Sequence, residues 1–598
     1  MNIWKKNNYF VALYVMVIMT FLSIFSVRAE DGKIYYFISR QSVKAMEAYT
    51  GESGNGIFVR QKRIEKNDPS QKWILEKKGD GVVIKSLKYG KYLTLSNDIV
   101  TLSSKPEIWT VTPYKNVYIF IKKKEKLALN LMGAGQDDDN PIIGYPQDNT
   151  ESCQWFLVSA DDVSETELKS EILLQNATYD NRNKIYILPP LPSAAGDADR
   201  LRTFRRSDLH PSGLYIHKGE KIHLLLEGTN EIEIQVGPEH KYGNTIYLKS
   251  TEGNAEFISP ADGMMYFRYI HYGFEKIVPS VATVKVTQGG EIVPFYVEGK
   301  TSYRDWLNSV RHNPGAPYIE MVGKRAMITV RADKYSESGE SDPKLIFKVI
   351  NDMIESYDDI SGLKSNQDAT DLPSPLRIHY VQDDFSRGED LAGVYMYATD
   401  YMIGMPGDSI FDLLNPVNNY RKWSVWHETG HIYQQWDWAP GGLTEVTVNI
   451  YSLHIQKHLG QPSGLTENKG NNEKNVYVLA GNYINNKGRN FIDDTTFPGD
   501  ISDWIKLVMF ERLKSELGDD FYRKLHVYYR HHPLKYIKEH SDEVKLNEFA
   551  YRASLVSGYN LIDYFSQWGL YLTNDTKSRI KKLNLPTAPL LLNQLPDK

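Results

Sequence analysis

The chain has 598 residues, a formal net charge of −5 and one cysteine, Cys153. A chain of this length can bury several hydrophobic cores without disulfides, and a single cysteine excludes an intrachain disulfide. The weakly acidic balance favours neither nucleic acid nor an anionic membrane as a partner, and the sequence gives no evidence of an obligate protein partner.

The first 29 residues have the pattern of an export signal. Lys5 and Lys6 precede an apolar stretch (residues 9–27), and the segment ends in Val-Arg-Ala at 27–29. Signal peptidase prefers short side chains at the last position before the cleaved bond and two positions earlier, which here are Ala29 and Val27. We therefore expect residues 1–29 to be a signal peptide and the mature chain to be periplasmic, cell-surface or secreted. A membrane anchor is the alternative, because the apolar stretch is near the length that spans a bilayer.

Residues 33–158 are predicted to form a separate β-domain. The stretch is rich in short apolar runs separated by glycine-containing turns. Three tryptophans, Trp73, Trp109 and Trp155, recur at intervals of roughly 40 residues, which indicates a threefold β-repeat. Each tryptophan ends one repeat of the predicted strands, so we expect all three to pack in the core of this domain.

This unit resembles a ricin-type β-trefoil, a family whose repeats each end in Gln-x-Trp. Only the first repeat keeps the glutamine, since Glu107 and Cys153 replace it in the other two. The resemblance implies that polar residues early in a repeat hold a sugar, and the matching positions are Glu47 and Asn130. A trefoil that binds glycans through these residues is one expectation, and a purely structural trefoil is the other.

Residues 165–300 are predicted to form a β-sandwich. Apolar side chains alternate with polar ones at Ile222, Leu224 and Leu226, and again from Ile232 to Val236. A period of two with glycine-rich turns is typical of antiparallel strands that bury one face.

Residues 301–598 are predicted to form a helix-rich domain. Asp342-Pro343 is a helix cap followed by a first-turn proline, and apolar residues then recur on one helical face. A second helix is expected from Asp503 to Leu517, ended by Gly518. The predicted fold is therefore a multidomain α+β chain with a β-trefoil, a β-sandwich and a helix-rich catalytic domain of the zincin class.

The five residues HETGH at 427–431 are the strongest functional pattern in the chain. On a helix, positions four apart lie on one face, so that His427 and His431 can bind one metal ion. Glu428 is then placed to act as general base toward a metal-bound water. A helix is expected from Asn418 to about Trp436, and the alternative is a buried helix with two core histidines.

The third metal ligand has two candidates. Asp437 lies six residues after His431, but the class that uses this spacing also needs a glycine where this chain has Gln434. Glu445 follows the Gly-Gly turn at 441–442 and opens a second predicted helix, from which it can reach back to the metal. Two histidines and one carboxylate leave the fourth zinc position open for water.

The run HETGHxxQxxxW followed by GGLTEVTVNIYSL resembles the enhancin-like, mucin-active zinc metallopeptidases, which belong to the gluzincins. The resemblance extends, more weakly, over about residues 200–590. It implies one zinc ion bound by His427, His431 and Glu445, with Glu428 as general base. It also implies glycoprotein substrates, especially mucin-type chains with O-linked sugars.

Two further site predictions depend on that resemblance and on the proposed chemistry. Gluzincins hold the substrate backbone along an edge strand, and the segment around Gly404 and Met405 is the candidate for it. Tyr433, Tyr551 and Tyr559 are the candidates for stabilising the oxyanion. The predicted function is that of a secreted zinc metalloendopeptidase. The alternatives are a general secreted zinc protease without glycan dependence and a glycan-binding adhesin with a vestigial zinc site.

Overall fold

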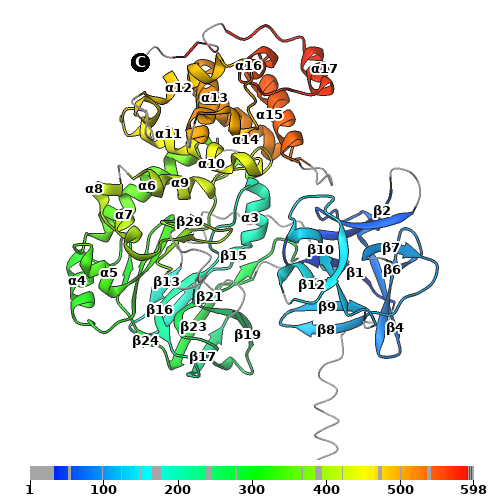
Figure 1. Cartoon of the computed structure of the whole chain (residues 1–598). Helices are drawn as coiled ribbons and strands as arrows, with labels where there is room; N and C mark the ends of the chain where they lie inside the picture. The colour runs from blue at the N-terminus through cyan, green and yellow to red at the C-terminus, as the bar shows by residue number, and fades with distance from the viewer. Residues whose placement is uncertain are drawn as a thin grey trace, which may run out of the picture. The chain divides into compact units, whose positions relative to one another are not determined.

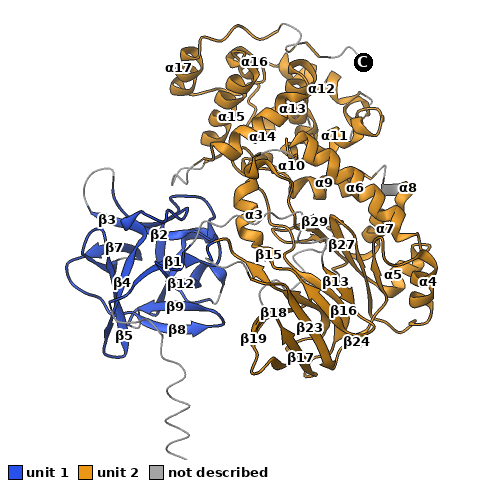
Figure 2. Cartoon of the chain, turned by 180° about the vertical axis from the view of Figure 1, so that it is seen from behind, with its two compact units in different colours: residues 1–166, 274–276 blue, residues 167–273, 277–598 orange. Residues whose placement is uncertain are grey.

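In the computed structural model the chain divides into two compact units (Figure 2). The first comprises residues 1–166 and 274–276, and the second comprises residues 167–273 and 277–598. The predicted signal peptide lies outside the described residues. Among the described residues, no helix is long and apolar enough to cross a membrane. The structure describes residues 32–51, 56–96, 98–122, 124–148, 150–163, 177–237, 245–275, 279–364, 368–383, 394–419, 422–468, 474–498, 501–534, 541–589, 592 and 594–595.

The first unit is a closed β-barrel built from one twelve-stranded sheet (Figure 1). The sheet closes because β1 pairs with β12, β2 and β4, and because β11 pairs with both β10 and β7. The strands are β1 (Ile34–Ser39), β2 (Ala45–Thr50), β3 (Ile57–Lys62), β4 (Trp73–Lys78), β5 (Gly81–Ser86), β6 (Tyr92–Ser96), β7 (Ile99–Ser103), β8 (Thr110–Tyr114), β9 (Val117–Lys122), β10 (Leu127–Leu131), β11 (Ile142–Pro146) and β12 (Trp155–Ser159).

The three tryptophans of the barrel occupy equivalent positions. Trp73, Trp109 and Trp155 are all fully buried in one core cluster. Their indole Nε1–H groups donate to the carbonyls of Met46, Leu93 and Leu129 at 3.0, 3.2 and 3.1 Å. Each buried indole therefore has its hydrogen-bond partner, as burial of a polar group requires. The predicted core role of these residues is confirmed.

The second unit begins with two five-stranded sheets that share a hydrophobic core. Their orders are β13-β14-β23-β17-β20 and β19-β18-β21-β16-β24. The alternating residues of β17 and β18 are buried in this core, one set from each sheet. The strands are β13 (Thr178–Asp180), β14 (Ile185–Leu188), β16 (His210–Ile216), β17 (Lys221–Glu227), β18 (Glu231–Val236), β19 (Thr245–Lys249), β20 (Asn254–Ile258), β21 (Gly263–Arg268), β23 (Ala282–Gln288) and β24 (Glu291–Ile292), with a separate pair of β15 (Leu191–Pro192) and β22 (Ile270–His271).

A six-stranded mixed sheet follows and leads into the helices. Its order is β25-β26-β27-β28-β30-β29, so β29 forms one edge. The short strand β30 pairs on one side with β28 and on the other with β29. The strands are β25 (Phe295–Val297), β26 (Tyr318–Val322), β27 (Ala326–Arg331), β28 (Ile378–Val381), β29 (Tyr397–Ala398) and β30 (Ile403–Gly404).

The remaining elements are helical and pack around one extended apolar core. The predicted helix at Asp342-Pro343 is confirmed as α6, where the Asp342 side chain caps the Lys344 N–H. The predicted helix ended by Gly518 is α13. The helices are α3 (Ala194–Leu201), α4 (Tyr303–Arg311), α5 (Ala332–Glu337), α6 (Pro343–Ile360), α7 (Ile410–Leu414), α8 (Pro416–Asn419), α9 (Trp423–His431), α10 (Thr444–Thr447), α11 (Asn449–His458), α12 (Val476–Ile484), α13 (Ser502–Leu517), α14 (Asp520–His531), α15 (Asp542–Ser557), α16 (Ile562–Gln567) and α17 (Asn574–Lys582).

The helix α9 that carries the HETGH motif is shorter than predicted. It ends at His431, and the following aromatic residues lie in turns. The N–H of Trp436 donates to the carbonyl of Arg202 at 3.1 Å, far away in the sequence. In a continued helix this N–H would bond the carbonyl four residues earlier, and here it bonds a distant segment instead. The spacing of apolar residues carries no information about such a tertiary bond.

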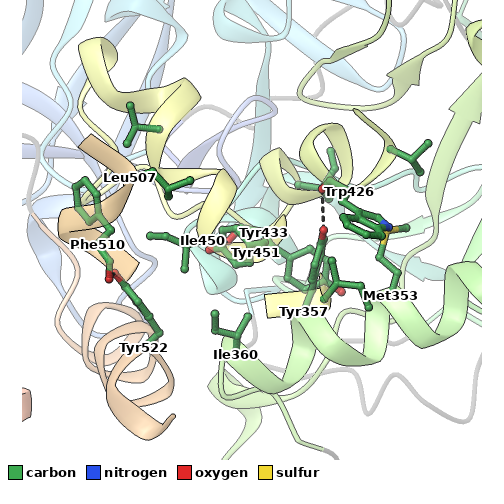
Figure 3. Close-up of a cluster of buried hydrophobic side chains, with 14 of the residues drawn as sticks. Met353, Tyr357, Ile360, Trp426, Tyr433, Ile450, Tyr451, Leu507, Phe510 and Tyr522 are labelled. Carbon is green, nitrogen blue, oxygen red and sulfur yellow. Dashed lines mark hydrogen bonds between the residues drawn. The ribbon is translucent and has the colours of Figure 1, made fainter. Parts of the chain in front are cut away.

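Buried side chains of the hydrophobic core pack against α9 (Figure 3). The Tyr357 hydroxyl, from α6, donates to the backbone carbonyl of Trp426 at 2.7 Å. A second tyrosine, Tyr380 on β28, lies 2.9 Å from the Thr429 hydroxyl. Two different elements thus fix the rotation of α9 about its axis, and with it the direction of the two histidines.

Truncating the middle tryptophan tests whether the three indoles hold the barrel together. We expect Trp109→Ala to cost about 3–5 kcal/mol, because it leaves a cavity and an unpaired Leu93 carbonyl. Hydrogen–deuterium exchange should speed up in peptides from residues 33–158 and stay unchanged in peptides around α9. The control is Tyr145→Ala, at a side chain that is 50% exposed, which should alter neither region. Unchanged exchange in Trp109→Ala would contradict the role of the indoles.

Candidate metal centre

The three predicted ligands converge in the structure. His427 and His431 lie one turn apart on α9, with their Nε2 atoms 3.2 Å from each other. The Oε2 atom of Glu445, in the first turn of α10, lies 2.8 Å from the Nε2 atom of His427 and 3.6 Å from that of His431. Among the described residues, these three form a group whose donor atoms all lie within 4.8 Å of one another.

The arrangement fits one tetrahedral metal ion. Zinc binds imidazole nitrogen and carboxylate oxygen at about 2.0–2.1 Å, which places two tetrahedral donors about 3.3 Å apart. The three observed separations of 2.8, 3.2 and 3.6 Å bracket that value. Two imidazoles and one carboxylate are also a donor set that zinc accepts with a fourth position left for water or substrate.

Two amide side chains set the protonation of the histidines. The Nδ1 atom of His427 lies 2.9 Å from the Oδ1 atom of Asn449, and that of His431 lies 3.0 Å from the Oε1 atom of Gln434. An amide oxygen can only accept, so each Nδ1 must carry the proton. The Nε2 lone pairs are therefore free for the metal, as this kind of supporting contact usually ensures.

The orientation of each amide is fixed in turn by its NH2 group. Asn449 Nδ2 donates to the carbonyl of Glu445 at 2.8 Å. Gln434 Nε2 donates to the Thr444 carbonyl at 2.8 Å and to the Thr447 hydroxyl at 2.6 Å. The Thr447 hydroxyl donates its own proton to a backbone carbonyl, so it can only accept here. Neither amide can flip without losing these bonds.

The electrostatics of the cluster follow from burial and from the short contacts. The short contacts of its carboxylate with the imidazole rings of His427 and then His431 hold the pKa of Glu445 well below its ordinary value. Burial alone would lower the pKa of His427, but Glu445 and Glu428 outweigh it and raise that pKa. Burial raises the pKa of Glu428, although both histidines oppose the shift. Glu428 is thus a stronger base than an exposed glutamate, because its charged form is less well solvated.

The glycine of the motif lets two helices approach closely. A Cβ atom at Gly430 would lie 2.9 Å from Cγ2 and 3.1 Å from the carbonyl of Val448. Val448 directly follows α10, which carries Glu445. The missing side chain therefore brings the third ligand within reach of the two histidines.

A carboxylate from a distant helix holds the turn before Glu445. The two oxygens of Asp542 accept from the N–H groups of Gly441 and Gly442 at 2.8 and 3.0 Å. These are consecutive backbone donors at the start of the segment that leads into α10. The bidentate contact fixes where that segment enters the site.

Asp437, the alternative third ligand, has a different role. Its two oxygens accept from Arg202 at 2.8 and 3.1 Å, and both side chains are almost fully buried. The Leu534 N–H also donates to it, at 3.2 Å. These contacts use the carboxylate for an interior ion pair, and Asp437 is not part of the donor cluster.

The predicted substrate contacts at Gly404 and Met405 need a correction. Both residues are buried, and β30 has partners on each side, so it offers no free edge for strand addition. A Cβ atom at Gly404 would lie 2.0 Å from Cζ of Tyr397 on β29. Among the described residues the edge strand is β29 itself, and the N–H of Ala398 on that strand lies close enough to the Glu428 carboxylate to oppose the rise of its pKa. The prediction placed the edge one strand too far inside the sheet.

The tyrosines suggested for the oxyanion do not share one position. Tyr433 is buried and donates to Asp358 Oδ1 at 2.8 Å, which commits its only proton. Tyr551 lies under the guanidinium group of Arg579, 4.0 Å from the ring centre. Tyr559 packs against the helical core. The structure therefore removes Tyr433 from this role.

Glu47 and Asn130, the suggested sugar contacts, are buried in the barrel. Glu47 is 3% exposed and accepts from Arg60 at 2.7 Å across the β2–β3 ladder. Asn130 is 4% exposed and lies on β10. They directly follow Met46 and Leu129, two of the carbonyls that receive an indole, so they are equivalent in the repeat. Their burial leaves little surface for a bound sugar.

Comparisons with known proteins place the site in a family. Residues 289–569 match peptidase M60, enhancin and enhancin-like. The matched segment is a peptidase M60 domain. It contains the whole donor cluster, the edge strand β29 and the helices α4 to α16.

Solved structures share the fold of about two thirds of this chain. A protein of unknown function from Bacillus anthracis is 29% identical, with a TM-score of 0.59, covering 68% of this chain and 80% of its own. A metallopeptidase in complex with Tn antigen is 17% identical, with a TM-score of 0.57, covering 70% of this chain and 81% of its own. At this identity the second likeness concerns the fold alone.

A curated relative is a TRPM8 channel-associated factor homolog from Xenopus laevis, 25% identical over 312 residues. The alignment covers 51% of this chain, and the chain spans only 31% of that relative's length. The likeness therefore concerns a part of that protein.

The sequence interpretation missed the residues that support the ligands. Gln434 lies three positions after His431, in the turns that follow α9, and Asn449, the first residue of α11, lies four positions after Glu445 on α10, so both have the spacing of one helical turn from a ligand. An amide at a helical offset from a metal ligand was the available indication. Asp542 gave no such indication, because it lies 97 positions after Glu445 in the sequence (542 − 445).

Replacing a supporting amide tests the histidine network. We expect Asn449→Leu to weaken zinc binding about 10–100-fold, since it leaves the Nδ1–H of His427 unpaired. The measurement is competition with a chelator of known affinity. The control is Asp437→Asn, which should lower stability by breaking a buried ion pair but leave zinc affinity unchanged. Equal zinc affinity in Asn449→Leu and the unmodified chain would contradict the role of Asn449.

Proposed function

We propose that the chain is a zinc metalloendopeptidase of the gluzincin type that hydrolyses peptide bonds in glycoproteins, with mucin-type O-glycosylated chains as the substrate class. The observation that carries the proposal is the donor cluster with its fixed histidine tautomers. His427, His431 and Glu445 would hold one zinc ion. The match to peptidase M60 over residues 289–569 supports the reaction class.

The proposed chemistry divides between the ion and the chain. When bound, zinc would polarise the scissile carbonyl and acidify water. Glu428 would take a proton from the attacking water and return it to the leaving amine. Its burial raises its pKa, which makes the carboxylate a stronger base for the first transfer. The protonated carboxyl is still far more acidic than an ammonium group, so it can give the proton to the leaving amine.

The substrate backbone would lie along β29. This strand is the edge of the sheet among the described residues, and its Ala398 N–H faces the site. Strand addition supplies main-chain hydrogen bonds without demanding a particular peptide sequence. Selection by a sugar on the peptide would then supply the specificity.

A glycoprotein substrate is favoured by the structural relatives. The metallopeptidase bound to Tn antigen covers 70% of this chain with a TM-score of 0.57. Its ligand is a glycan antigen, and its likeness to this chain is one of fold. The proposal for this chain extends to the class of O-glycosylated peptide and not to a particular sugar.

We further propose that the barrel is a β-trefoil, that the two five-stranded sheets form a β-sandwich and that residues 1–29 direct export. The trefoil is supported by the equivalent pairing of Trp73 with Tyr35, Trp109 with Val82 and Trp155 with Tyr118. In each pair, the tryptophan that ends a repeat lies beside the first strand of that repeat. Because Glu47 and Asn130 are buried, any glycan binding by this barrel would use other side chains.

Substitution of the general base tests the reaction. We expect Glu428→Gln to keep zinc affinity and stability, and to reduce kcat on a mucin-type glycopeptide by at least about 10²–10⁴-fold. The control is Glu227→Gln at an exposed position of β17, which should leave turnover unchanged. Turnover near that of the unmodified chain in Glu428→Gln would overturn the mechanism. Zinc binding without any turnover in the unmodified chain would favour an adhesin with a vestigial site.

Removal of the sugars tests the substrate class. We expect one mucin-type glycopeptide to be cleaved before, but not after, enzymatic removal of its O-glycans. Product masses from the two incubations give the measurement, and a generic protease serves as the control that the stripped peptide remains cleavable. Equal cleavage of both forms would leave the metallopeptidase intact and favour a general zinc protease without glycan dependence.

A further inference from the structure

A small cavity lies in the second unit, next to the turns that follow α9. It is formed where the segment after α3, the end of α6, the turns after α9 and the helix α14 meet. It has room for one guest of about the size of a water molecule. The polar residues that line it include Thr203, Arg206, Ser361, Tyr433, His526 and Arg530.

Arg206 brings an unpaired positive charge to this cavity. It is 3% exposed, and its Nη2 atom has no hydrogen-bond partner among the described residues. Its contacts are a long hydrogen bond of 3.5 Å from Nη1 to the Thr203 hydroxyl and a stacking contact 4.6 Å from the centre of the Tyr433 ring. No carboxylate of the described residues forms an ion pair with it. A guanidinium group stays charged at all ordinary pH values, so it cannot avoid this cost by losing a proton.

The charged groups nearby are already matched with one another. Arg530 donates from Nε to Asp371 Oδ1 at 2.7 Å. Asp197, whose pKa is lowered in part by Arg206, accepts from Arg200 at 2.6 Å on one oxygen and from Ser374 at 2.6 Å on the other. Both oxygens of Asp197 are therefore used by other donors, and Arg206 is left as the group in need of a counter-charge.

The other polar groups on the cavity do not supply a negative charge. His526 is fully buried, and burial lowers its pKa to about 3, so it is neutral. The Ser361 hydroxyl is buried near the Tyr451 hydroxyl, has no other hydrogen-bond partner among the described residues and can donate. Tyr433 donates its proton to Asp358 Oδ1. The cavity thus offers donors next to a positive charge, and none of these groups carries a negative charge.

We propose that this cavity binds one monoatomic anion, chloride under ordinary conditions, held by the Nη2 group of Arg206 and the hydroxyl of Ser361. A water molecule would satisfy the donors but leave the charge unbalanced in a buried site. A polyatomic anion such as sulfate or gluconate is too large for a cavity of this size. The size of the cavity and the sign of the charge therefore point to the same class of ligand.

The anion would stabilise the segment that follows the metal helix. Arg206 stacks on Tyr433, which lies two residues after His431, and Tyr433 is anchored at its other end to Asp358. An anion that fixes Arg206 would therefore also fix the turn that follows α9. The expected effect is on stability, because a ligand that binds only the folded state shifts unfolding toward higher temperature.

The experiment compares halide with gluconate at equal ionic strength. For the full, zinc-loaded chain, we expect the Tm to be higher in sodium chloride than in sodium gluconate by about 2 °C or more, with saturation as chloride rises. Bromide should replace chloride, and crystals soaked in bromide should show an anomalous peak beside the Arg206 guanidinium group. A water molecule at that position in the bromide-soaked crystals would overturn the proposal.

Two variants separate a bound anion from a general salt effect. Arg206→Met keeps much of the apolar stem but removes the charge, so its Tm should be the same in chloride and in gluconate. Arg311→Met removes an exposed arginine, which pairs with Glu340 on the surface, and should keep the chloride dependence of the unmodified chain. Chloride dependence that persists in Arg206→Met would overturn the proposal. If Arg206→Met does not fold, the chloride titration and the bromide soak of the unmodified chain decide the question.

Discussion

The close approach of α9 to the start of α10 is the contact on which the candidate site depends. Gly430 permits it, because any larger side chain would collide with Val448. At that separation a carboxylate on one helix can meet two imidazoles on the other, as the 2.8 Å contact between Glu445 and His427 shows. The glycine therefore has a larger effect than its cost of about 1 kcal/mol in helix propensity suggests.

The surroundings of the cluster determine its chemical state. Asn449 and Gln434 leave each Nε2 atom unprotonated, and both amides are fixed by backbone or hydroxyl acceptors on the Glu445 segment. The segment that supplies the third ligand thus also sets the tautomers of the other two. The site is a single hydrogen-bonded unit, so a change in the position of α10 would affect all three ligands together.

Buried charge is a recurring feature of the second unit, and much of it is paired. Arg202 with Asp437 and Arg530 with Asp371 are ion pairs in which both partners are buried. Each pair joins segments far apart in the sequence, and its loss would leave an uncompensated charge in the interior. Arg206 forms no such pair among the described residues, and its Nη2 atom also lacks a hydrogen-bond partner, which is why an anion is the natural partner for it.

The three candidate metal ligands, which the structure brings together, were predicted from local sequence. HETGH needs only helical spacing to place two histidines on one face, and the Gly-Gly turn before Glu445 marked the next helix. The caps of α6 and α13 and the core tryptophans of the barrel were likewise predictable, because caps and periodic apolar residues act within a few positions. The alternation of β17 and β18 was predictable for the same reason.

Tertiary structure decided what local spacing does not encode. The register of the six-stranded sheet placed the free edge at β29 and buried Gly404, since strand order depends on pairing between distant segments. The buried partner Arg202 claimed Asp437, and Arg60 claimed Glu47. The bond from Asp542 to Gly441 and the unpaired charge of Arg206 also arise only when remote segments meet. The sequence by itself determined which residues can bind a metal, and the fold decided which remote groups position them.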